Sequence, residues 1–194
     1  MKKSNIILFF IFLITSLVYS QTNVAIKFKN GTEIHDLVNS DGFKITSLEN
    51  KTTYNSDSIS EVTVHHSKES YKFYFLNAKI DTRYKKDLKV IGTKVYSKGE
   101  IEIFAVHFYF IGDIKYLKPL KINYSKQEVY IRRKKDKFVY SIGCIDGIGC
   151  KNIKKRLKKF FYDCPKLIKG MRKNKIKDWE ILKIVNLYYS LINE

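Results

Sequence analysis

The stretch NVAIKFKNGTEIHDLV, residues 23–38, decides the fold of this chain. Val24, Ile26 and Phe28 alternate with polar residues, which is the period of a strand that buries one face. The dipeptide Asn30-Gly31 comes next, followed by a second strand-like segment, and this dipeptide is typical of a tight hairpin turn. The stretch therefore predicts an antiparallel hairpin that begins a sheet.

The same period of two continues towards the C-terminus. Asp41-Gly42 and Ser97-Lys98-Gly99 supply further turns, and a Lys-Lys-Asp turn separates the last two segments. Short strands joined by tight turns indicate an antiparallel β-meander or a small, partly open barrel. The segments that show this alternation are Thr32–Val38, Phe43–Ser47, Val62–Val64, Tyr71–Phe75, Val90–Tyr96, Ile101–Val106, Val129–Arg133 and Phe138–Ile142.

After Gly149 the apolar residues recur with the period of a helix. One face of the expected helix, residues 150–162, is apolar, and a chain of this size is expected to pack such a face on its sheet. Pro165 ends the helix at about Asp163. The apolar face consists of Ile153, Leu157, Phe160 and Phe161, with Arg156 at the edge and with Lys151, Lys154, Lys155, Lys158 and Lys159 opposite.

Two more helices are expected before the chain ends. A short one covers about Lys166–Met171 with Asp163 as its cap, and the last one starts after Asp178, a good N-cap residue. Strands followed by helices predict an α+β fold with two to three C-terminal helices packed on the sheet. We expect a single domain over residues 21–194, with residues 21–142 mainly β and residues 143–194 helical.

The N-terminus has the three parts of a secretory signal peptide. Lys2 and Lys3 precede an apolar run from Ile6 to Val18, and the small residue Ser20 follows shortly after. This pattern predicts a signal peptide over residues 1–20, because the run is shorter than the ~20 residues that span a bilayer. The mature chain is expected to be periplasmic or secreted, without a transmembrane segment.

The basic charge is concentrated in one part of the chain. Of the 37 basic residues, 32 are Lys and 5 are Arg. Residues 21–114 carry 13 basic and 12 acidic side chains, whereas residues 115–177 carry 21 basic and 4 acidic ones. Lysine acts as a solvated point charge, while base-edge readers favour the arginine fork, so nucleic acid is an unlikely partner. The imbalance favours attraction to an anionic lipid, polysaccharide or acidic protein.

The stretch GCIDGIGC, residues 143–150, holds two of the three cysteines. The spacing of Cys144, Cys150 and Cys164 does not suit zinc, whose ligands come in close pairs. Cys150 and Cys164 would lie roughly 20 Å apart along a helix, too far for a bridge. A disulfide between Cys144 and Cys150 is one interpretation for an exported chain, and three reduced thiols are another. A bridge between Cys144 and Cys164 would need the end of the strand to lie beside the far end of the helix.

No motif in the sequence assigns a reaction. His65 and His66 are neighbours on an expected strand and point to opposite faces, so they cannot jointly hold one ion. A phosphate-binding glycine loop, a nucleophile elbow and an HExxH pattern are all missing from the sequence. We therefore expect no catalytic residues, no metal and no cofactor.

Several segments resemble the small secreted or periplasmic proteins of Bacteroidetes-type bacteria that have no assigned activity. The resemblance rests on the signal peptide, the glycine hairpins, the strand Tyr130–Arg133, the segment Phe160–Leu167 and the segment Ile184–Tyr189. It implies an envelope or secreted protein and brings no catalytic residues with it.

Two hypotheses of function follow from these patterns. The first is a non-enzymatic envelope protein that binds an anionic partner through its basic C-terminal third, with Lys151, Lys154, Lys155, Lys158 and Lys159 as the contact residues. The second is a β domain that binds a small ligand or peptide, or a hydrolase without a recognisable motif, with a cleft between the meander and the helices.

Overall fold

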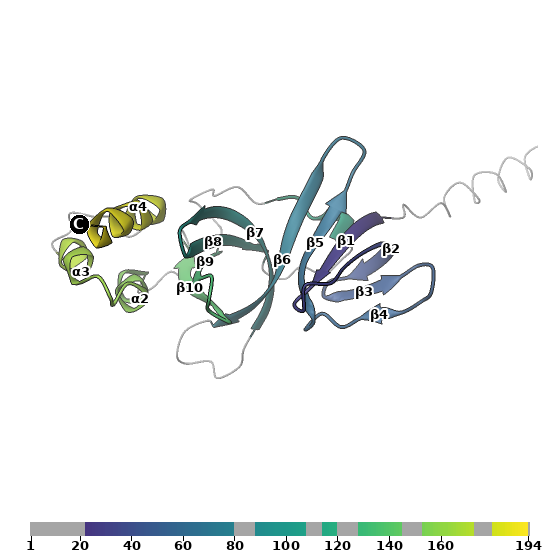
Figure 1. Cartoon of the computed structure of the whole chain (residues 1–194), viewed down its shortest axis with the longest axis horizontal. Helices are drawn as coiled ribbons and strands as arrows, with labels where there is room; N and C mark the ends of the chain where they lie inside the picture. The colour runs from purple at the N-terminus through teal and green to yellow at the C-terminus, as the bar shows by residue number, and fades with distance from the viewer. Residues whose placement is uncertain are drawn as a thin grey trace, which may run out of the picture.

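The computed structural model describes residues 22–79, 88–107, 114–119, 128–144, 153–172 and 180–193. These residues form one ten-stranded sheet followed by helices (Figure 1). The strands are β1 (Thr22–Phe28), β2 (Glu33–Asp41), β3 (Lys44–Ser47), β4 (Thr53–Tyr54), β5 (Ile59–His65), β6 (Ser70–Lys79), β7 (Leu88–Lys98), β8 (Ile101–His107), β9 (Glu128–Arg133) and β10 (Val139–Cys144). The helices are the 3-10 helix η1 (Ile114–Tyr116) and the α-helices α2 (Ile153–Phe160), α3 (Pro165–Arg172) and α4 (Ile181–Ile192).

The first hairpin forms as its sequence predicts. β1 pairs antiparallel with β2, and Val24 faces Asp36 in the register. Gly31 at the turn has a φ of 92°, which favours glycine, and Thr32 donates its backbone N–H to the side chain of Asn30. The turn chemistry thus sets the register of the sheet at its N-terminal start.

The C-terminal half of the sheet closes on itself. The strand order is β10-β9-β8-β7-β6-β5-β1-β2-β3-β4, and β10 also pairs with β6. That pairing is parallel, with Val139 opposite Ala78 and Tyr140 opposite Lys79. In an antiparallel run of five strands, the first and the last point the same way, so only a parallel pairing can close the ring β6–β10.

The N-terminal half of the sheet curls around its own core. Fully buried side chains of β1, β3 and β5 meet those of β6. Ile114 of η1 and Leu117 directly after it join this core from far along the chain. Ile114 donates its backbone N–H to the Ser40 hydroxyl at 2.6 Å, which anchors η1 to β2. The core residues of this half include Val24, Ile26, Ile45, Ile59, Val62, Val64 and Phe73.

The three α-helices cover the outer face of the ring (Figure 1). Ile101, Ile103 and Ile131 point outward from the ring and form one apolar cluster with residues of α2, α3 and α4. The predicted α+β class, with C-terminal helices packed on the sheet, is therefore confirmed. No helix in the described part of the chain has both the length and the apolar character that a bilayer crossing requires.

The structure corrects several local predictions. The two-residue strand β4 was not predicted, and α2 ends at Phe160, two residues before the expected end at residue 162. The proposed N-cap role of Asp178 is wrong, because α4 begins at Ile181 with Glu180 in the N-cap position and without a side-chain cap. The carboxylate of Asp163, the predicted cap of α3, is engaged by Arg133 and Tyr188.

Candidate anion-binding surface on the helical layer

The helices α2 and α3 each divide into an apolar and a basic side. Leu157 of α2 is fully buried, and Phe161 just after the helix is fully buried as well. On α3, Leu167 and Met171 are fully buried in the same cluster. Because the apolar side of each helix faces the ring, the lysines between these residues are directed towards the surface.

The lysines that the sequence predicts as contacts for an anionic partner differ in their exposure to solvent. Lys155 and Lys159 are exposed one turn apart, while Lys154 and Lys158 are half-buried on the neighbouring ridge of α2. Lys151 lies outside the described residues. Two exposed lysines of α3, Lys166 and Lys169, were not among the predicted contact residues, although their spacing from the buried Leu167 and Met171 would have identified them.

Asp163, the acidic residue between α2 and α3, is bound by an arginine of the sheet. Residues 153–172 contain eight Lys and Arg residues and one acid, Asp163. Both carboxylate oxygens of Asp163 accept hydrogen bonds from the Arg133 guanidinium at 2.9 Å, and one also accepts from the Tyr188 hydroxyl at 2.8 Å. The Asp163 carboxylate is thus engaged by an arginine of the sheet.

Arg133 ties the three helices to the sheet. From β9 it also donates to the backbone carbonyl of Phe160 at 3.4 Å and to the Tyr188 hydroxyl at 3.0 Å. Burial alone would lower the pKa of Arg133, but the hydrogen bonds and charges of Tyr188 and Asp163 outweigh it and raise the pKa. The guanidinium therefore stays charged at the junction of α2, α3 and α4.

Additional cations and exposed aromatic groups adjoin this layer. Lys134, Lys135 and Lys137 are exposed in the turn between β9 and β10, directly after Arg133 at the base of the turn. The ring of Tyr140 lies 6.4 Å from that of Phe160, which joins this hairpin to the end of α2. Tyr162, in the turn before α3, is 75% exposed. The basic surface thus comprises Lys154, Lys155, Lys158, Lys159, Lys166 and Lys169, with Lys134, Lys135 and Lys137 nearby.

Arg156 departs from the pattern of its neighbours. It is half-buried, and it donates to the Ser141 hydroxyl of β10 at 3.0 Å. The sequence placed this residue at the edge of the basic face, and the structure turns its guanidinium towards the ring. Arg156 therefore fastens α2 to the sheet and is not counted in the basic surface.

The helix α4 is held by the hairpin between β7 and β8. The Tyr189 hydroxyl accepts a hydrogen bond from the backbone N–H of Glu100 at 2.7 Å. Asn186 accepts from Tyr96 at 2.9 Å and from Lys98 at 2.7 Å. These contacts fix the helical layer on the ring and so fix the orientation of its lysines.

The interior of the ring contains an ion-pair network. Glu102 is 4% exposed and contacts Lys94 at 2.6 Å and Arg132 at 2.7 Å. Burial alone would raise the pKa of Glu102, but the hydrogen bonds from Lys94 and Arg132 outweigh it and lower the pKa. The Glu102 carboxylate is paired with both Lys94 and Arg132, and the network links β7, β8 and β9. It therefore adds nothing to the basic surface.

Glu128 and Tyr130, both in β9, form a second set of polar side chains in the ring. Burial, reinforced by the nearby charge of Glu128, raises the pKa of the Tyr130 hydroxyl, and burial likewise raises the pKa of Glu128. The fully buried Tyr130 ring belongs to the apolar cluster inside the ring. We assign this group a packing role in the ring.

The remaining candidate residues are separated. His65 and His66 diverge as predicted: the ring of His65 lies 6.4 Å from that of His35, whereas the ring of His66 lies 5.3 Å from that of Tyr71. Within the described residues no group of three His, Cys, Asp or Glu side chains could hold a metal ion. Cys164 is buried and reduced. The disulfide predicted between Cys144 and Cys150 falls on side chains outside the described part of the structure.

Comparison with known protein families, with curated proteins and with solved structures finds no family model, protein or structure that matches this chain.

Proposed function

We propose that this chain is a non-enzymatic, exported envelope protein that binds an anionic surface through the basic surface on α2 and α3. The contact is made by lysine side chains alone, without insertion of the helices. Insertion would require Leu157, Leu167 and Met171 to leave a core in which each is fully buried.

The local surplus of charge is the observation that carries this proposal. Residues 153–172 contain seven lysine and arginine residues besides Arg156 and a single acid, and that acid is bound by Arg133. Each lysine near an anionic surface contributes about 1 kcal/mol of attraction, which falls as salt rises. Several lysines acting together on a rigid layer can therefore hold a partner that none of them could hold alone.

The partner is a macromolecule or a membrane surface with repeated negative charges. Lysine side chains lack the planar fork that reads bases or clamps single phosphates. Anionic lipid headgroups, an acidic polysaccharide or an acidic protein face satisfy these requirements.

The test compares two variants that lose the same charge. Lys155, Lys158, Lys159 and Lys169 are changed to Gln in one variant, and Lys27, Lys29, Lys44 and Lys51 of the N-terminal half are changed to Gln in the other. Co-sedimentation with vesicles containing phosphatidylserine, and retention on heparin, are measured at low salt. The helical variant is expected to bind at least about a hundredfold more weakly, since four lysines each lose about 1 kcal/mol, while the control variant binds nearly as the parent does.

Equal weakening of both variants would show that net charge alone controls binding, and the proposed surface would be wrong. Binding that persists at about 0.5 M salt would also contradict the proposal, because the Debye length there is only about 4 Å. Vesicles, heparin and an acidic protein column are tested in parallel, so that the preferred partner is identified by the strongest salt-sensitive retention.

The export part of the proposal has its own measurement. Mass spectrometry of the protein recovered outside the cytoplasm is expected to find a mature chain that begins at Gln21. A chain recovered with Met1 intact would contradict export while leaving the basic surface to be judged by the binding test.

A further inference from the structure

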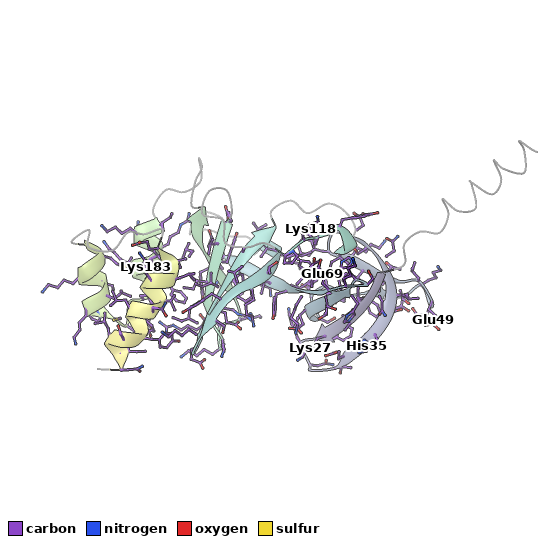
Figure 2. All side chains as sticks on the ribbon, turned by 90° about the horizontal axis from the view of Figure 1, so that it is seen from above. Lys27, His35, Glu49, Glu69, Lys118 and Lys183 are labelled. Carbon is purple, nitrogen blue, oxygen red and sulfur yellow. The ribbon has the colours of Figure 1, made fainter. Side chains whose placement is uncertain are left out.

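A second surface feature lies on the N-terminal half of the molecule. A groove of about 350 Å³ runs between the turn that joins β5 to β6 and the segment around η1. Figure 2 labels Glu69 and Lys118 on this half, away from Lys183 on α4 in the other half. The groove is therefore separate from the basic surface on α2 and α3.

Both walls of the groove are fixed by the core. On one side Ile114 and Leu117 are buried in the N-terminal cluster, and the hydrogen bond from Ile114 to Ser40 holds η1 in place. On the other side the backbone N–H of His66 donates to the carbonyl of Glu69 at 2.8 Å and closes the turn. The groove is thus largely formed before a ligand arrives, which lowers the entropic cost of binding.

The lining combines aromatic rings with charged groups. The rings of His66 and Tyr71 lie 5.3 Å apart, and Tyr116 stands 73% exposed on the wall formed by η1. Among the described residues of the lining, Lys68 and Lys118 are accompanied by one carboxylate, that of Glu69. The site therefore presents aromatic faces with a net positive charge.

This combination restricts the class of ligand. A small molecule needs most of its surface buried, and an open groove with an exposed tyrosine on its wall cannot enclose one, so a segment of a longer chain fits better. A peptide cannot add a strand here, because β5 is already paired with β1 and β6, and β6 with β5 and β7. The apolar C–H face of a sugar ring packs well on the negative face of an aromatic ring.

We propose that this groove binds a segment of an acidic polysaccharide, with Tyr116 and Tyr71 as platforms for sugar rings and Lys68 and Lys118 as partners of sugar carboxylates. Glu69 and His66 supply hydrogen-bonding groups for sugar hydroxyls. The groove adds a second binding site to the proposed function and does not depend on the basic surface.

The test uses a hexamer of galacturonic acid and its fully methyl-esterified form, which keeps the sugar rings and loses the carboxylate charges. Binding is measured by calorimetry on the full mature chain and on two groove variants, Tyr116→Ala and Lys68→Gln combined with Lys118→Gln. Each variant is expected to weaken binding of the acid at least about tenfold, the effect of losing about 1.4 kcal/mol. The four-lysine variant of α2 and α3 serves as the control that separates the two sites.

The inference is overturned if the methyl ester binds as tightly as the acid, or if neither groove variant weakens binding. It is also overturned if binding is lost only in the four-lysine variant, a result that would instead support the basic surface as the polysaccharide site. Because Tyr116, Lys68 and Lys118 are all exposed, circular dichroism is expected to show that the groove variants remain folded.

Discussion

The curled N-terminal sheet and the ring with its helical layer are built from strands of the same alternating pattern, yet they complete their cores differently. Strands β1–β6 bend around one apolar cluster, and the small helix η1 completes it. The strands of the ring fill its interior with one cluster and need α2, α3 and α4 to cover a second cluster on its outer face.

The two halves also differ in charge. Residues 21–114 are nearly balanced in acids and bases, and pairs such as Lys72 with Glu61 and Lys89 with Asp57 compensate charges on the sheet surface. In the helical layer, residues 153–172 carry eight basic side chains and one acidic side chain. The elements that complete a core can thus be nearly neutral or strongly basic. The excess charge of the helical layer lies on its surface and plays no part in packing the core.

The largest expected effect comes from breaking the cluster under the helices. Leu157→Asp places a charge among fully buried groups and is expected to undock α2 and unfold the helical layer, since an unpaired buried charge costs several kcal/mol. Lys155→Asp, on the exposed side of the same helix, is the control and should change the free energy of unfolding by less than about 0.5 kcal/mol. Denaturant unfolding followed by circular dichroism measures both; similar losses would mean that α2 is not docked through Leu157.

The next effect compares two glycines that both have positive φ. Gly99 has a φ of 52°, and a Cβ there would lie 2.5 Å from the Tyr189 hydroxyl, whereas Gly31 has a φ of 92° with open space around it. Changing either to Ala costs about 1–2 kcal/mol of backbone strain. Gly99→Ala should cost roughly 1–3 kcal/mol more through overpacking against α4.

Thermal and denaturant unfolding of the two alanine variants measure this difference. Equal destabilisation of Gly31→Ala and Gly99→Ala would indicate that α4 does not rest on the hairpin between β7 and β8.

A smaller effect concerns the ion-pair network inside the ring. The pKa of Glu102 is lower in the folded chain than its ordinary value of 4.5, so its ionised form stabilises the fold above that pH, and this contribution is lost as the pH falls through the folded pKa. Glu102→Gln should therefore lose about 1.5–3 kcal/mol at pH 7. The stability difference from the parent should shrink in acid below pH 4.5.

Unfolding by urea at a series of pH values measures this dependence. Glu61→Gln on the N-terminal half is the control, because its partner Lys72 is half exposed and surface pairs contribute at most about 1 kcal/mol. A constant difference between Glu102→Gln and the parent across acid pH would contradict the assigned role of the carboxylate.

The sequence by itself determined the strands other than β4, the hairpin turns and the side of α2 that faces the core. These features depend on residues close together in the chain: the alternation around Val24 and Ile26, the Asn30-Gly31 turn, and the spacing of Ile153, Leu157 and Phe160. The sequence also determined the uneven distribution of charge, which is a matter of counting residues.

Only the tertiary structure decided the contacts between distant parts of the chain. The closure of β6 with β10 depends on the number and curvature of the strands between them, and the role of Ile114 depends on where the N-terminal sheet leaves its core open. Asp163 has the composition of a helix cap, yet Arg133, 30 residues earlier, engages its carboxylate. Such partners are set by the packing of whole elements, which the local periodicity of a sequence does not encode.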